Sequence, residues 1–144
     1  MKAEEPRNAA ARIRRGQIWT GNLNPTRGRE VGKIRPVLVI QGDWLSAAQA
    51  RTVVVLPLTS NVYSAGEPLR VTLRARDALR EDSQIVVDQP RTLDRRRLGP
   101  ELLTELTAAE ISKVEQSLLA VMGITNTRYF LDRSAAGSDT HASA

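Results

Sequence analysis

The sequence contains no cysteine and a single histidine, His141, which lies in a run of small residues near the C-terminus. The absence of cysteine excludes disulfides, thiolate zinc sites and cysteine nucleophiles. One histidine in such a place argues against a Ser-His-Asp triad and against a metal site made of several histidines. We therefore expect neither a metal ion nor a cofactor.

Aromatic residues and long hydrophobic runs are also scarce. Aromatic residues make up 3% of the chain, so an extended platform for stacking bases is not expected. Trp19 and Tyr63 are the side chains that could stack on a base, and Trp19 fits a core position equally well. The apolar runs 36–40 and 53–58 are too short to cross a bilayer, and residues 1–15 lack the apolar stretch of a signal peptide. These absences favour a cytoplasmic protein.

Positive charge is present in excess. Lysine and arginine number 21 against 16 aspartate and glutamate residues, which gives a net charge of +5. Apart from Lys2, Lys33 and Lys113, every basic residue is an arginine. The planar guanidinium of arginine binds phosphate in a bidentate manner, so the composition is compatible with a polyanionic partner. A basic surface that serves only solubility is the alternative.

The length of 144 residues fits one domain. We expect a flexible arm at 1–13, a folded domain at 14–133 and a disordered tail at 134–144. The strands predicted from apolar and β-branched runs are 17–23, 36–40, 52–58, 69–73, 83–89 and 91–93. The second and third of these runs are continuously apolar, which is typical of strands buried on both faces. Short strands at this spacing indicate a small barrel.

The last third of the folded domain has a helical period. Thr107 and Glu110 have the spacing of a capping box, in which each side chain binds the backbone amide of the other residue. Apolar residues follow from Ile111 at helical spacing, and Gly123 is a typical residue to end a helix. We expect this helix to pack its apolar face on the barrel.

Two polar clusters lie in the first half of the domain. The segment 24–35 contains proline and glycine, so it is expected to form a loop, and its charged residues are Arg27, Arg29, Glu30, Lys33 and Arg35. Such a basic loop suits phosphate binding, although a solvated charged loop has the same composition. The second cluster is 57–61, at the end of a predicted strand. Its hydroxyl and amide groups can donate to an anion or can cap a turn.

A third cluster, 88–97, follows the predicted strand 83–89. Arg91 comes directly after a proline, which predicts a defined place for it, whereas Arg95, Arg96 and Arg97 are expected to be surface charges. An aspartate, Asp88, opens the cluster.

In this order the segments resemble the MazF/PemK toxin family of toxin–antitoxin systems. The resemblance is carried by Gly-Gln-Ile-Trp at 16–19, the loop 24–30, Arg-Pro at 35–36, Pro-Leu-Thr-Ser at 57–60 and Asp-Gln-Pro-Arg-Thr at 88–92, and it covers residues 14 to 123. It implies a mainly β (α+β) fold, a small SH3-like β-barrel with a C-terminal helix, in a homodimer. It also implies a sequence-specific endoribonuclease that cleaves single-stranded mRNA without metal, arrests growth, and is inhibited by an antitoxin with an acidic disordered tail.

The resemblance also implies site residues. Arg35 and Thr59 match the catalytic pair of the family, and Glu30 matches an acidic residue that supports the site. Asp88 matches an aspartate of the PemK-like branch. That branch has a histidine in the loop where this chain has Arg29, so an acid–base role is not expected at this position.

The implied reaction is attack of a ribose 2′-OH on the adjacent phosphorus, which leaves a 2′,3′-cyclic phosphate and a 5′-OH. Arg35 would stabilise charge on the phosphorane, and Thr59 would donate to a nonbridging oxygen. Glu30 is the first candidate for the general base and Asp88 the second, with proton transfer by the substrate itself as a third possibility. The expected RNA-binding residues are Trp19, Asn24, Thr26, Arg27, Arg29, Lys33, Gln41, Ser60, Asn61, Gln89 and Arg91.

Two other functions are compatible with the same fold. One is a toxin that binds gyrase, and the other is a non-catalytic barrel that binds a nucleic acid or a protein. Intact Arg-Pro and Pro-Leu-Thr-Ser motifs favour the nuclease.

Overall fold

The computed structural model describes residues 13–24, 28, 33–48, 50–62, 66 and 68–124. The elements are β1 (Gln17–Asn22), β2 (Ile34–Val39), α2 (Asp43–Ala47), β3 (Thr52–Thr59), β4 (Arg70–Leu73), β5 (Ser83–Val86), β6 (Arg91–Asp94), the 3-10 turn η1 (Arg95–Arg97), β7 (Leu98–Glu105) and α3 (Ala108–Val121). Each predicted strand corresponds to one of β1 to β6. The short helix α2 and the strand β7 are additions that the sequence did not predict.

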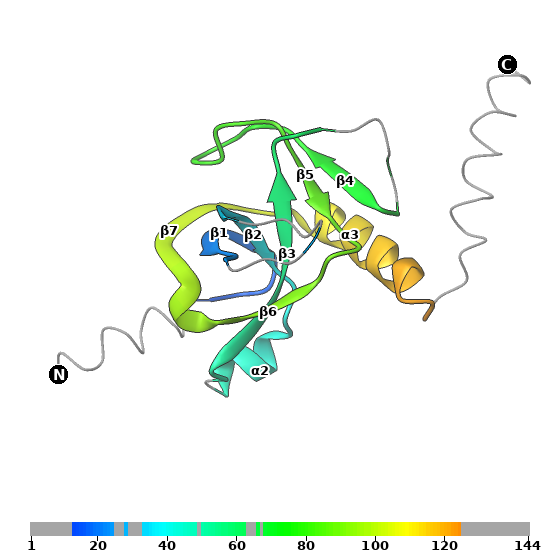
Figure 1. Ribbon diagram of the computed structural model, residues 1–144. Helices are drawn as coiled ribbons and strands as arrows, with labels where there is room; N and C mark the ends of the chain where they lie inside the picture. The colour runs from blue at the N-terminus through cyan, green and yellow to red at the C-terminus, as the bar shows by residue number, and fades with distance from the viewer. Residues whose placement is uncertain are drawn as a thin grey trace, which may run out of the picture.

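The strands form one antiparallel sheet in the order β4-β5-β3-β2-β1-β7, and β6 pairs with β3 as well. In Figure 1, β3 runs through the centre of the molecule, and β5 and β6 pair with different parts of it. Among the described strands, β4 and β7 stand at the two ends of the order and do not pair, so the predicted barrel is not closed. The predicted fold class, a mainly β domain with a C-terminal helix, is confirmed.

The central strands are buried on both faces, as their continuous apolar runs predicted. Successive side chains of a strand point to opposite faces of the sheet. Leu56 and Leu58 of β3 therefore pack in the core that includes Val114 of α3. Val53 and Val55 belong to a second core on the opposite face. In Figure 1, α3 lies beside β4 and β5, and residues of these three elements line one shallow hollow.

The helix α3 begins and ends at the predicted residues. The Thr107 hydroxyl accepts from the Glu110 amide at 3.2 Å, and the Glu110 carboxylate accepts from the Thr107 amide at 2.8 Å, which completes the capping box. Gly123 adopts a φ of +73°, and the Ile124 amide donates to the Leu119 carbonyl at 2.9 Å. This is the Schellman arrangement, in which a left-handed residue satisfies the last helical carbonyls.

The predicted arm and tail fall almost wholly outside the described residues, and so does His141. The boundaries predicted for them therefore stay predictions. In the part of the chain that the structure describes, no helix is long and apolar enough to cross a membrane.

Candidate active site

Arg35 and Thr59 lie at matching positions of neighbouring strands. In the antiparallel pairing of β2 with β3, Val37 is opposite Pro57 and Val39 is opposite Val55. Arg35 and Thr59 each lie two residues beyond Val37 and Pro57, at the same end of this strand pair. Residues two apart on a strand share a face, so both side chains leave the sheet on the face of Val37 and Pro57. The fold thus brings together the two residues that the family motif marks.

The Thr59 hydroxyl is oriented by the turn that follows β3. The Asn61 amide donates to Thr59 Oγ1 at 3.1 Å. A hydroxyl that accepts in this way keeps its own hydrogen for donation to another group. Segment 57–61 therefore forms a strand end and a turn, and it also leaves a donor at Thr59. Ser60 and Asn61 are exposed.

A hollow of about 320 Å³ lies beside Arg35. Residues of β2 and Ser60 line one part of it, and Ser83, at the start of β5, lines another. The remaining wall comes from Leu103 of β7 and from the segment 78–81 between β4 and β5, which brings Arg80 and Glu81 to the hollow. Neither was predicted as a site residue, because the segment that carries them matches none of the quoted motifs and approaches Arg35 only through the fold.

Hydrogen bonds join the two ends of the basic loop, and we call this junction of Leu23 and Asn24 with Lys33 the neck of the loop. The Leu23 amide donates to the Lys33 carbonyl at 2.8 Å, and the Lys33 amide donates to Asn24 Oδ1 at 2.9 Å. Lys33 adopts a φ of +67° there. The loop therefore re-enters the sheet two residues before Arg35, which fixes its base at the candidate site. Asn24, predicted to read a base, uses its side-chain oxygen in this neck.

Two arginines from the third polar cluster hold the same neck. Arg91 Nη2 donates to the Leu23 carbonyl at 2.8 Å. Arg97 Nη1 donates to the carbonyls of Asn22 and Asn24. The prediction of a defined place for Arg91 agrees with this contact. The two guanidinium groups contact the start of the loop across sequence separations of 68 to 75 residues, which a linear motif does not reveal.

The expectation that residues 95–97 are all surface charges is therefore wrong for two of them. Arg97 binds the neck, and Arg95 Nη2 donates to the Ser46 carbonyl at 2.8 Å while burial lowers the Arg95 pKa. The Arg96 side chain is 91% exposed. It pairs with Asp94, and this hydrogen bond lowers the pKa of that carboxyl to about 2.

Asp88 is held away from the hollow. Arg70 Nη1 donates to Asp88 Oδ1 at 2.9 Å, and this ion pair joins β4 to the turn after β5. Ser83 lines the hollow from the first residue of β5, whereas Asp88 follows the last residue of that strand. Within this chain, the structure does not bring Asp88 together with Arg35 and Thr59.

Two predicted RNA contacts do not fit their surroundings. Trp19 is 4% exposed, and its indole donates to Gln17 Oε1 at 3.0 Å, so it is a core residue. Gln41 is 5% exposed; it donates to Ser46 Oγ at 3.0 Å and accepts from the Val54 amide at 3.3 Å. The indole of Trp19 and the amide of Gln41 form hydrogen bonds within the protein, so neither side chain is available to a base.

Several other predicted residues lie outside the described part of the chain: Thr26, Arg27, Arg29, Glu30 and Tyr63. Gln89 is half-buried in the connection between β5 and β6. Within the described residues, no group of three or more His, Cys, Asp or Glu side chains is placed to hold a metal ion.

The chain is similar to known toxins along most of its length. Residues 14–122 match the model of the PemK-like, MazF-like toxins of type II toxin–antitoxin systems. Endoribonuclease MazF of Staphylococcus epidermidis is 36% identical over 115 residues, which is 79% of this chain and 94% of that protein.

Solved structures of similar proteins have the same fold. MazF from Deinococcus radiodurans superposes with a TM-score of 0.64 at 28% identity, over 77% of this chain and 96% of that one. A mycobacterial endoribonuclease in complex with its cognate antitoxin superposes with a TM-score of 0.63 at 23% identity, over 79% and 98% of the two chains. The matching arrangement of motifs, sheet and helix leads to one conclusion: the chain belongs to the PemK-like, MazF-like toxin family of type II toxin–antitoxin systems.

Proposed function

We propose that this protein is the toxin of a type II toxin–antitoxin system and cleaves single-stranded mRNA as a sequence-specific endoribonuclease in the cytoplasm. The observation that carries the proposal is that Arg35 and Thr59 lie at the same end of the β2–β3 pair, next to the neck of a basic loop. The 36% identity to a protein named Endoribonuclease MazF supports the same activity. Cleavage would stop translation of the cut messages and arrest growth.

The chemistry follows from the groups present. The ribose 2′-OH attacks the adjacent phosphorus, and the P–O5′ bond breaks to leave a 2′,3′-cyclic phosphate and a 5′-OH. Arg35 stabilises the negative charge that builds on the nonbridging oxygens. Thr59, whose hydroxyl retains a hydrogen to donate, binds one of those oxygens. Preorganised donors of this kind each contribute about 3–4 kcal/mol to transition-state stabilisation.

Glu30 remains our candidate for the general base. It belongs to the loop whose neck closes two residues before Arg35. Asp88 is the weaker candidate, because its carboxylate is bound to Arg70 beyond the far end of β5. Arginine stays protonated at neutral pH, so Arg35 serves as a charge and a donor and not as a base.

RNA binding involves the basic loop and the residues that follow β3. Lys33, Ser60 and Asn61 are exposed next to the Arg35–Thr59 position and can contact phosphate or base edges. Arg91 contributes by holding the start of the loop. Arg27, Arg29 and Thr26 of the loop itself supply further contacts in this proposal.

The partners proposed are a second copy of this chain and a cognate antitoxin. In a symmetric homodimer, two copies of the basic loop would border one groove and double its positive charge. An antitoxin with an acidic tail would then bind this groove by charge complementarity and compete with RNA. Family membership in toxin–antitoxin systems supports the antitoxin partner.

The test is cleavage of a long single-stranded RNA in the presence of EDTA, with the wild-type protein beside Arg35→Ala and Thr59→Ala. The proposal requires cleavage that survives EDTA and is lost in both variants. Binding without cleavage by the wild type would indicate a non-catalytic module. Inertness toward RNA together with inhibition of gyrase would indicate the other alternative function.

A further inference from the structure

We propose that the hollow beside Arg35 is a nucleotide subsite of the RNA-binding surface, in which Arg80 binds a phosphate next to the scissile one and Glu81 binds the base. This inference rests on the proposed function, because it places one nucleotide of the substrate. It adds two residues, from the connection between β4 and β5, that no sequence motif marks.

The hollow has the size and the lining of a site for a small polar ligand. Its volume of about 320 Å³ is at the lower end of the range for ligand pockets, which suits a single nucleotide. Ile34, which is exposed, and Pro36, which is half-buried, give it an apolar part, against which a base can lie. Ser60 adds an exposed hydroxyl group, and Arg35 lies at the same hollow. A nucleotide bound here would therefore adjoin the Arg35–Thr59 position.

Arg80 is available to a ligand, whereas most of the arginines that the structure describes are bound to other groups of the protein. It is exposed, and it makes no hydrogen bond or ion pair with any other residue that the structure describes. Other described arginine side chains donate to acceptors within the protein, among them Arg15, Arg70, Arg76, Arg91, Arg95, Arg96 and Arg97. An arginine without such an acceptor, at the edge of a hollow that also holds Arg35, is suited to a phosphate.

Glu81 supplies selectivity for the base. A carboxylate repels a phosphate, so its place in this wall favours contact with hydrogen-bond donors of the base. Glutamate accepts hydrogen bonds from amino groups on base edges, as it does from cytosine N4. We therefore infer that the base in this subsite carries an exocyclic amino group on its Watson–Crick edge.

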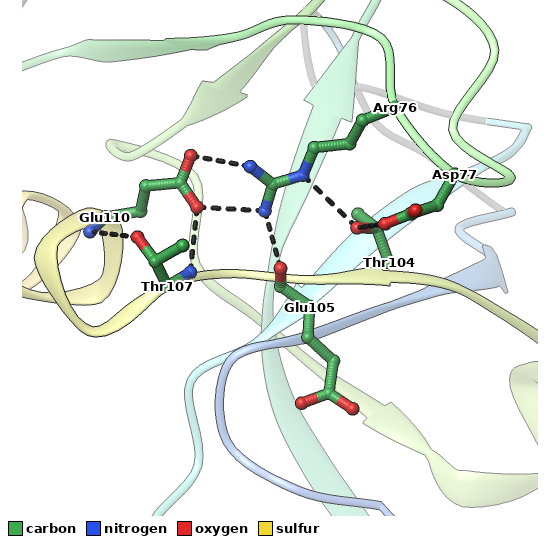
Figure 2. Close-up of polar contacts among 6 residues, drawn as sticks. All are labelled: Arg76, Asp77, Thr104, Glu105, Thr107 and Glu110. Carbon is green, nitrogen blue, oxygen red and sulfur yellow. Dashed lines mark hydrogen bonds and ion pairs between the residues drawn. The ribbon is translucent and has the colours of Figure 1, made fainter.

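The wall that carries Arg80 and Glu81 is held firmly by Arg76, at its other end. Arg76 Nη1 and Nη2 bind the two carboxylate oxygens of Glu110 at 2.7 and 2.9 Å, and Nε donates to Thr104 Oγ1 at 3.2 Å (Figure 2). Nη2 also donates to the Glu105 carbonyl at 2.5 Å. Such bidentate contacts fix both position and orientation.

The backbone of the wall is fixed as well. Arg76 and Leu79 exchange two backbone hydrogen bonds of 2.8 Å, and the Ala78 amide donates to the Leu103 carbonyl at 3.0 Å. Asp77 adopts a φ of +51° and accepts from the Thr104 hydroxyl at 2.6 Å, as Figure 2 shows. Arg80 and Glu81 thus follow a rigid turn, and little ordering is needed when they bind a ligand.

The first test measures binding without cleavage. The probe is a mixed-sequence single-stranded RNA with 2′-fluoro riboses, which lack the nucleophile, and its affinity is measured against salt concentration. Arg80→Ala should flatten the slope of log affinity against log salt by ~0.7, the amount for one single-strand phosphate contact. Arg74→Ala is the matched control, since Arg74 is also exposed in the same connection but does not line the hollow. An equal change in the two variants would overturn the phosphate contact.

The second test measures base selectivity. The 5′ ends of cleaved transcripts are sequenced for the wild type and for Glu81→Gln, which keeps the shape but loses the charge. We expect the preference at one position beside the cut to relax by about tenfold or more, with the remaining positions unchanged. An unchanged profile would overturn the base contact.

The outcomes separate this inference from the proposed function. If the wild type cleaves RNA and the salt slopes of Arg80→Ala and Arg74→Ala are equal, the proposed function holds and the subsite is overturned. If the wild type does not cleave RNA but the salt slope is flattened in Arg80→Ala alone, the subsite holds and the proposed nuclease activity is overturned. A change of oligomeric state in Arg80→Ala with an unaltered slope would assign the wall to contact with a second copy and overturn the subsite.

Discussion

Arg35 of β2 and Thr59 of β3 each lie two residues beyond Val37 and Pro57, the last pair of these two strands. Their spacing is set by the backbone register of the sheet, in strands whose apolar residues are buried in two cores. A charge and a hydroxyl donor are therefore held at the same end of the β2–β3 pair before any substrate arrives. This preorganisation is what electrostatic stabilisation of a phosphorane requires.

Removal of either group should lower the rate of RNA cleavage. We expect Arg35→Ala and Thr59→Ala each to reduce kcat about 10²- to 10³-fold, the usual cost of losing one transition-state donor. Thr59→Ser keeps the hydroxyl and should retain most of the activity. Single-turnover cleavage of a defined RNA measures these rates. A Thr59→Ala variant as fast as Thr59→Ser would show that the hydroxyl has no part in the reaction.

The neck of the basic loop should depend on the acceptor of Asn24. Its Oδ1 binds the Lys33 amide, so Asn24→Ala removes one hydrogen bond and should destabilise the fold by about 1 kcal/mol. Asn24→Asp keeps the acceptor and should retain the stability. Urea denaturation of both variants measures the difference. Equal losses of stability in both would contradict the structural role assigned to this side chain.

The elements that the sequence predicted are those with a strong local signal. The continuous runs of β2 and β3 are buried on both faces, and Thr107, Glu110 and Gly123 mark the two ends of α3. β7 was not predicted because Gly99 and Pro100 lie in its first half, and its pairing with β1 is a contact distant in the sequence. Helix α2 has five residues, which is too short for a period to appear.

The Arg76–Glu110 ion pair should make stability depend on pH. Hydrogen bonding from Arg76 lowers the pKa of Glu110 below its ordinary value of 4.5. The pair therefore stabilises the fold above pH 4.5, and this contribution is lost as the pH falls through the lower pKa of the folded state. We expect Arg76→Met to cost about 2 kcal/mol at pH 7 and progressively less below pH 4.5.

Urea denaturation at pH 7 and pH 3 checks this expectation. Arg96→Met is the matched control, because Arg96 also pairs with a carboxylate but its side chain is 91% exposed. It should change the stability little. A difference between Arg76→Met and the wild type that is the same at both pH values would contradict the ionic origin of the stabilisation.

The capping box should contribute separately to the stability of α3. Thr107→Ala removes the hydroxyl that accepts from the Glu110 amide and should cost about 1 kcal/mol. Thr107→Ser should be close to neutral, since serine caps helices equally well. Thermal unfolding followed by circular dichroism compares the two. A serine variant as unstable as the alanine variant would mean that packing of the Thr107 methyl group, and not the cap, is responsible.

Candidate site residues could be predicted from the sequence where they belong to a recognisable motif. Residues that approach the site from a distant segment could not. Arg35 and Thr59 were predicted from Arg-Pro and Pro-Leu-Thr-Ser, and their catalytic roles stay predictions. Trp19 was misplaced because an aromatic residue in a strand suits both a core and a stacking surface, and its burial decides for the core. Arg80 and Arg97 were missed, because their relation to the site comes from the turn after β4 and from η1.

The most direct test of the central claim replaces the attacking hydroxyl. An RNA that the protein cuts at one position is compared with the same RNA carrying a single 2′-deoxy nucleotide on the 5′ side of that position, in EDTA. We predict a 2′,3′-cyclic phosphate and a 5′-OH from the first RNA and no cut at that position in the second. Cleavage of the deoxy-substituted RNA at the same position would contradict attack by the 2′-OH and the roles derived for Arg35 and Thr59.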